Sequence, residues 1–91
     1  MEKIAEDKIR FSVVTAKGTE FEKTVGYVNI PTDFGSVGIL KGHAPMFCAV
    51  AKGVAKCSFG GDMSAKILVG EGVANVADNE VTLLVSTAEV Q

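Results

Sequence analysis

The sequence contains no tryptophan, one tyrosine, one histidine and two cysteines. A single histidine excludes zinc sites built from several histidines, and His43, Cys48 and Cys57 do not have the spacing of a structural zinc site. Two cysteines are too few for a disulfide scaffold, so we expect both thiols to be reduced. Binding sites for carbohydrates and other small ligands commonly use aromatic platforms, and the scarcity of tryptophan and tyrosine disfavours such a site.

The chain also lacks an excess of basic residues and a long apolar run. Its formal net charge is −2, and its lysines and arginine are scattered. A protein that binds nucleic acid or an anionic membrane usually gathers basic residues on one face. No run of 18 apolar residues is present, and the acidic start over residues 1–7 does not resemble a signal peptide. We therefore expect a soluble protein that binds no nucleic acid and inserts no segment into a membrane.

The residues that are abundant favour strands. Valine, isoleucine and threonine make up 24 of the 91 residues (13, 5 and 6), whereas leucine occurs only four times. Ten glycines leave few windows that are long enough for an amphipathic helix. A chain of this length forms one domain, and so small a core favours stabilisation by a partner. We predict an all-β domain over residues 9–91, preceded by an N-terminal extension over residues 1–8 whose order the sequence leaves open.

Alternating apolar residues and turn-forming separators locate the strands. The runs predicted to be strands are residues 9–15, 20–30, 37–40, 46–50, 54–59, 64–69, 73–76 and 81–85. In the second run Gly26 is expected to form a bulge or bend, and Pro31 is expected to end the strand. Loops are expected over 32–36 and 41–45. Eight short strands at this spacing are typical of a sandwich or a barrel.

Three strands carry apolar residues on both faces: Val13-Val14, Ile39-Leu40 and Leu83-Leu84-Val85. A strand with one wet face should alternate cleanly between apolar and polar residues. Two interpretations stay open, because isolated apolar residues are common on surfaces. In the first, a loop covers the second face or its isolated apolar residues are simply exposed. In the second, that face binds a partner.

The sequence contains few candidate catalytic groups. Cys48 and His43 could form a nucleophilic pair, but Cys48 lies between apolar residues of a strand and is expected to be a small hydrophobic residue. The glycines near residues 35–42 and 70–72 complete neither a phosphate-binding loop nor a dinucleotide fingerprint. His43 in its Gly/Pro loop either bonds its own backbone or is a contact residue on an exposed loop.

The His43 loop and the strands around it resemble a known family. Residues 34–45, Phe-Gly-Ser-Val-Gly-Ile-Leu-Lys-Gly-His-Ala-Pro, resemble the signature E-G-x-x-G-(I/V)-L-P-G-H-A-P of the epsilon subunit of F-type ATP synthase, called delta in mitochondria. Other stretches that are similar to the family's strands are residues 11–18, 21–22, 25–30, 53–54, 70–76 and 79–85. The resemblance covers about residues 9–89.

The resemblance implies an epsilon-type β-sandwich of about ten antiparallel strands over residues 9–91. It also implies a non-catalytic subunit of the central stalk, which couples ion-driven rotation of the c-ring to ATP synthesis by binding gamma and the c-ring. The subunit would be present as one copy in the complex. It would lie at the cytoplasmic face of an energy-coupling membrane, such as the bacterial plasma membrane, as a peripheral part of the F1 sector.

Family positions then suggest contact residues. His43 is expected at the gamma contact, and Gly35, Ser36 and Val37 are expected in the loop that meets the c-ring. The resemblance implies no catalytic residue, no metal, no cofactor and no nucleotide site in this chain. Two departures concern these loops: Ser36 stands where family members often carry an acid, and Lys41 replaces the usual proline.

A third departure is at the end of the sequence. Family members usually continue into an inhibitory two-helix hairpin, which binds ATP in many bacteria, whereas this sequence stops at Gln91. We therefore expect no inhibitory switch in this polypeptide. The alternatives to a stalk subunit are a stand-alone β-sandwich that binds a small ligand and an enzyme centred on Cys48 or His43.

Overall fold

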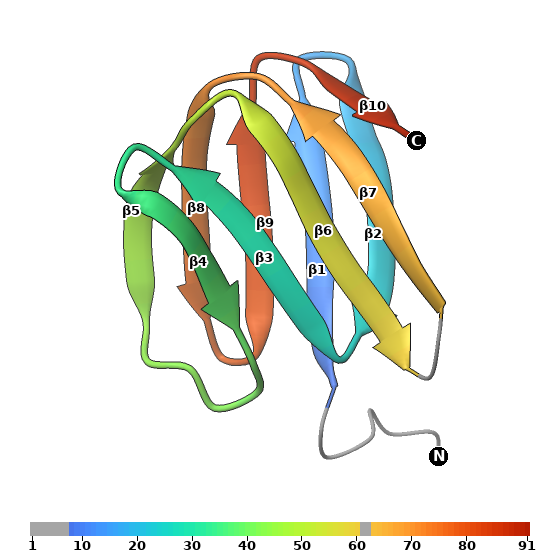
Figure 1. Cartoon of the computed structure of the whole chain (residues 1–91), viewed down its shortest axis with the longest axis vertical. Helices are drawn as coiled ribbons and strands as arrows, with labels where there is room; N and C mark the ends of the chain where they lie inside the picture. The colour runs from blue at the N-terminus through green and yellow to red at the C-terminus, as the bar shows by residue number, and fades with distance from the viewer. Residues whose placement is uncertain (1–7, 61–62) are drawn as a thin grey trace.

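The computed structural model of the chain describes residues 8–60 and 63–91, which form two β-sheets packed face to face (Figure 1). The ten strands of this part are β1 (Ile9–Thr15), β2 (Gly18–Val25), β3 (Tyr27–Thr32), β4 (Gly35–Ile39), β5 (Met46–Val50), β6 (Gly53–Gly60), β7 (Met63–Val69), β8 (Gly72–Ala77), β9 (Glu80–Val85) and β10 (Ala88–Val90). The predicted all-β class and sandwich architecture are confirmed. Apart from Lys8, the predicted N-terminal extension lies outside the described residues.

The two sheets have five strands each. Sheet A has the order β2-β1-β9-β8-β5, and sheet B has the order β10-β7-β6-β3-β4. Neighbouring strands are antiparallel except β1 and β9, which run parallel, so the expectation of antiparallel strands fails for that pair. A parallel pair needs a long connection, which β2 to β8 provide. Within the described residues no helix is long and apolar enough to cross a membrane.

The core fills the space between the two sheets. Ile9, Phe11 and Val13, which the alternation of the first strand places on one side, are all fully buried. Phe11 meets Phe21 edge to face, with 5.7 Å between the ring centroids. The other buried apolar residues are Val25, Val28, Ile30, Ile39, Val50, Ala55, Cys57, Ile67, Val69, Ala74, Val76, Val81, Leu83 and Val85. Both sheets therefore contribute one face to a single core.

Gly26 divides the predicted strand 20–30 into two strands of different sheets. β2 ends at Val25 in sheet A, and β3 begins at Tyr27 in sheet B. The Gly26 N–H donates a 2.8 Å hydrogen bond to the Ser58 carbonyl of β6, which fixes the crossing. Val25 and Val28 are both buried, because the expected bend at Gly26 is a passage from one sheet to the other.

Pro31 does not end β3, which continues to Thr32 and pairs with β4. The Pro31 carbonyl accepts a 3.0 Å hydrogen bond from the Ala51 N–H. A residue's nitrogen and carbonyl point to the same side of a strand, so the missing N–H of Pro31 faces away from β4. The proline therefore removes no hydrogen bond between β3 and β4. The predicted loop 32–36 shrinks to a tight turn, with β4 starting at Gly35.

Candidate functional site

His43 lies in the β4–β5 loop, which is held by hydrogen bonds at several points. The His43 N–H donates to the Leu40 carbonyl at 3.1 Å, and Nδ1 lies 2.7 Å from the Ala44 carbonyl. Because a carbonyl oxygen only accepts, the hydrogen of this contact is carried by Nδ1, which leaves Nε2 for other partners. His43 is half-buried. The expected backbone hydrogen bond of the histidine is thus present, and its role in contacting a partner stays a prediction.

The residues predicted to meet the c-ring lie on the edge strand β4 and not in a loop. Gly35 and Ser36 are exposed, whereas the half-buried Val37 packs against the core. Gly35 has a φ of 107°, which favours glycine at the first position of the strand. The expectation of a loop is therefore wrong here, and two of the three residues are exposed to solvent.

The His43 loop and the β3–β4 turn lie at opposite ends of the sandwich (Figure 1). β4 connects them and has five residues, which span about 17 Å at about 3.3 Å per residue. The structure does not bring the two predicted contact regions together. A partner at the His43 end and a partner at the Ser36 end could bind at the same time.

The outer face of sheet A carries a continuous apolar row. Val14 pairs with Leu84, Leu84 pairs with Val73, and Val73 pairs with Ala49, so the row crosses four neighbouring strands. Leu84 is 49% exposed, and Phe47, two residues before Ala49 on β5, is 70% exposed. We call these five residues the apolar row. No loop of the described chain shields Leu84 and Phe47 from solvent.

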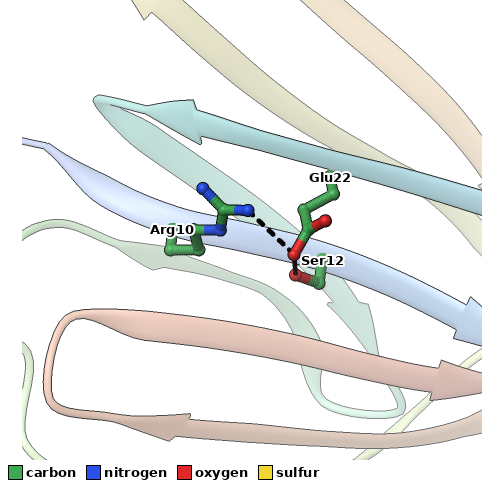
Figure 2. Close-up of polar contacts among 3 residues, drawn as sticks. All are labelled: Arg10, Ser12 and Glu22. Carbon is green, nitrogen blue, oxygen red and sulfur yellow. Dashed lines mark hydrogen bonds and ion pairs between the residues drawn. The ribbon is translucent and has the colours of Figure 1, made fainter. Parts of the chain in front are cut away.

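Polar residues border the apolar row on β1 and β2. Arg10 Nη2 lies 3.0 Å from Glu22 Oε2, and the Ser12 hydroxyl donates to the same oxygen at 3.4 Å (Figure 2). Both charged side chains are nearly half exposed, so this pair contributes only about 0–1 kcal/mol to stability. An apolar centre with a polar rim is the usual anatomy of a protein interface.

The outer face of sheet B is less apolar than that of sheet A and carries charged residues. Lys56 and Lys66 are directly opposite each other on β6 and β7, and both are exposed. Like charges at such positions repel. Leu68 on β7 is 43% exposed, but its cross-strand neighbours are the half-buried Val54 and the charged Glu89. Apolar surface is therefore continuous on sheet A and interrupted on sheet B.

Sequence reasoning found part of the apolar row. The doubled apolar residues at Val13-Val14 and Leu83-Leu84-Val85 mark two of its members. Phe47, Ala49 and Val73 were missed, although Phe47 and Ala49 alternate with core-facing residues along β5. Leu40, from the third doubled pair, is 59% exposed but lies in the His43 loop and outside the row.

The described residues contain no group of three or more histidine, cysteine or acidic side chains that could hold a metal ion. Cys48 and Cys57 are both free. Burial raises the pKa of the Cys57 thiol, although a backbone hydrogen bond with Ala65 and the charge of Lys23 act in the opposite direction. A raised pKa disfavours the reactive thiolate. Cys48 is half-buried and packs against the core.

Fold and surface together define a class: small β-sandwich modules with one exposed apolar face. The family model "ATP synthase, Delta/Epsilon chain, beta-sandwich domain" matches residues 8–91. The chain therefore belongs to the delta/epsilon chain family of ATP synthase, as the signature around His43 suggests.

Curated relatives support this membership. The ATP synthase epsilon chain of Prochloron didemni is 41% identical over 78 residues, which are 86% of this chain and 57% of the relative. The chloroplastic ATP synthase epsilon chain of Guillardia theta is 35% identical over 81 residues, which are 89% of this chain and 61% of the relative. The chain thus spans less than two thirds of the length of these relatives.

Two solved structures share the fold. A chain of the Euglena gracilis mitochondrial ATP synthase, in a structure of its OSCP/F1/c-ring part, superposes with a TM-score of 0.85 at 21% identity, covering 98% of this chain and 56% of that chain. A chain of the Tetrahymena thermophila mitochondrial ATP synthase, in a structure of the central stalk and c-ring, superposes with a TM-score of 0.72 at 17% identity, covering 90% of this chain and 66% of that chain.

Proposed function

We propose that this chain is a non-catalytic rotor subunit of ATP synthase that binds the gamma subunit through the apolar row of sheet A. The observation that carries the proposal is the continuity of that row across β1, β9, β8 and β5. Family membership and the epsilon chain names of its relatives indicate the complex. The similar Tetrahymena chain comes from a structure of the central stalk and c-ring, which supports a place in the rotor.

The size of the sandwich suits such a contact. A standard protein interface buries about 800 Å² on each partner, which one face of a five-stranded sheet can supply. A few well-packed side chains near the centre of an interface contribute most of the binding energy. Phe47 and Leu84 are the exposed large side chains of the row. The Arg10–Glu22 pair would lie at the polar rim.

In this proposal the two ends of the sandwich bind different partners. We assign the His43 loop to gamma and the Gly35–Val37 segment to the c-ring. The two regions lie at opposite ends of β4, so one subunit can link both partners (Figure 1). The ten strands between them share one closely packed core, and such a core is a stiff connection for torque. We also propose that the subunit is attached peripherally to an energy-coupling membrane, on its cytoplasmic face, as part of the F1 sector.

Co-purification tests the proposal. A tagged copy of the full chain is expressed in its native source, and the membranes are solubilised in mild detergent. Affinity purification is expected to recover the gamma subunit in equal amounts, together with the other F1 subunits and the c-ring. Recovery of the chain without gamma contradicts the proposal.

A further inference from the structure

Phe34 is the most exposed of the large apolar residues that the structure describes. Its relative exposure is 101%, compared with 70% for Phe47 and 66% for Met63. It lies at the tip of the β3–β4 turn, where no other described residue covers the ring. Phe34 also stands where the family signature has glutamate. The turn thus presents an aromatic ring at the end of the sandwich.

Hydrogen bonds hold the backbone of the turn at Phe34 in place. The Thr32 hydroxyl donates a hydrogen bond to the Gly35 carbonyl and accepts one from the Phe34 N–H, at 3.2 Å in the latter case. Gly35 adopts a φ of 107°, which lets the chain turn back into β4. A turn whose backbone is already ordered loses less conformational entropy when it binds. Phe34 therefore has the properties of a binding anchor.

The charges around Phe34 indicate which kind of partner it would bind. Asp33, the preceding residue, is exposed, and no lysine or arginine occurs over residues 31–40. An anionic membrane surface would repel this carboxylate. One exposed cation, Lys52, lies in the neighbouring β5–β6 turn, where the Ala51 N–H donates to the Pro31 carbonyl. A single lysine is not the basic cluster that an anionic membrane attracts. An apolar pocket in a protein, with a basic group at its edge, would accept both the ring and the carboxylate.

We propose that Phe34 is an anchor residue that inserts into an apolar pocket of a protein partner, where a basic group at the rim pairs with Asp33. Because Phe34 adjoins the Gly35–Val37 segment, the partner surface is the loop region of the c-ring. This identification rests on the proposed function. Thr32 is a positioning residue for the anchor.

A single tryptophan reports directly on the environment of the anchor. The chain has no tryptophan, so Phe34→Trp introduces one probe at the tip. Adding detergent-solubilised c-ring to the complex of this variant with gamma is expected to shift the tryptophan emission to shorter wavelength, after subtraction of the spectrum of the wild-type complex. Met63→Trp, at the first residue of β7, is the matched control and is expected to show no shift. β7 begins at the end of the sandwich opposite to the β3–β4 turn (Figure 1). An unshifted Phe34→Trp emission on a bound c-ring overturns the proposal.

Affinities for gamma and for the c-ring distinguish a failure of this inference from a failure of the proposed function. Phe34→Ser is expected to weaken binding of the chain–gamma complex to the c-ring at least about tenfold, or about 1.4 kcal/mol, and to leave gamma affinity unchanged. Met63→Ser is expected to change neither affinity. Normal c-ring binding by Phe34→Ser contradicts the anchor alone. If the wild-type complex with gamma does not bind the c-ring, both the anchor and the c-ring contact are contradicted. If the wild-type chain does not bind gamma, the proposed function is contradicted.

Two further measurements test whether Thr32 positions the anchor and whether the partner is a protein or a membrane. Thr32→Val removes the hydroxyl but keeps the shape of the side chain, and it is expected to weaken c-ring binding, with rescue by Thr32→Ser. Vesicles of phosphatidylcholine and phosphatidylglycerol in equal amounts are expected to bind the wild-type chain and the Phe34→Ser variant equally weakly. Vesicle binding that Phe34→Ser abolishes would assign the ring to lipid and overturn the proposal.

Discussion

The side-chain oxygen of Asn79 accepts a 2.8 Å hydrogen bond from the Gly42 N–H, which connects the His43 loop to the β8–β9 turn. Asn79 has a φ of 62° and Gly42 a φ of 85°. Both are conformations that asparagine and glycine tolerate better than most residues. The contact holds His43 at a defined place although the loop has no strand of its own.

Removing the Asn79 amide should loosen this loop. Asn79→Gly keeps the left-handed backbone but deletes the hydrogen bond to Gly42, whose net value is about 0.5–1.5 kcal/mol. We expect faster hydrogen exchange of the Gly42 amide. Asp78→Gly is the control, because Asp78 is the other left-handed residue of the turn, whereas the bond to Gly42 comes from Asn79. Equal protection in the two variants would contradict this account of the loop.

His43 is expected to contribute to gamma binding through its free ring nitrogen. His43→Ala should weaken gamma binding by about 1 kcal/mol, the usual net value of one hydrogen bond. Lys41→Ala changes an exposed residue of the same loop and should have a smaller effect. Calorimetric titration of gamma with each variant measures the difference. If His43→Ala binds like the wild type, the histidine is structural only.

Gly72 is required by close packing of β8 against β9. A Cβ atom at this position would collide with the Leu84 carbonyl and lie 2.6 Å from the Val85 Cα, both in the backbone. Gly72→Ala should therefore lower the free energy of unfolding by about 1–3 kcal/mol.

Gly38→Ala is the matched control for this effect. Its added Cβ would meet the Tyr27 hydroxyl, at the movable end of a side chain, at 2.6 Å. We expect a smaller loss of stability in urea unfolding than for Gly72→Ala. The reverse order would show that the spacing of β8 and β9 is not the constraint.

Ser36 offers a test of charge at the c-ring end. Ser36→Glu restores the acid that family members often carry, and it should strengthen c-ring binding by no more than about 1 kcal/mol. The gain should fade at high salt, since exposed charges are screened. Ser36→Gln matches the size without the charge and should show no gain at low salt. Equal affinities for the Glu and Gln variants would argue against a basic c-ring partner at this position.

Local patterns in the sequence predicted much of the fold. The alternation of Ile9, Phe11 and Val13 indicated the buried side of β1. The short gap between the predicted strands 73–76 and 81–85 indicated the tight β8–β9 turn, which contains Asp78 and Asn79. The crossing at Gly26 could not be predicted, because a bend inside one strand and a passage between sheets have the same local sequence. The parallel pairing of β1 with β9 depends on residues about 70 positions apart, which no local pattern encodes.

The candidate site was predictable only in part for a related reason. The motif placed His43 in a loop, but the separation of His43 from Ser36 follows from the direction of β4. The apolar row exists because four strands come into register, so Val73 and Ala49 gain importance only from their neighbours. The exposure of Phe34 depends on where the short turn projects, which the loop prediction over 32–36 did not specify.

The central claim is that sheet A binds gamma through the apolar row, and a matched pair of leucines tests it most directly. Leu84 on sheet A and Leu68 on sheet B are 49% and 43% exposed. Each can be changed to aspartate without burying a charge in the core. Calorimetric titration of purified gamma measures the affinity of the wild-type chain, Leu84→Asp and Leu68→Asp. We predict 1:1 binding by the wild type and by Leu68→Asp, and binding at least about tenfold weaker by Leu84→Asp, or about 1.4 kcal/mol. Unchanged affinity of Leu84→Asp, or loss of binding only in Leu68→Asp, would contradict the account.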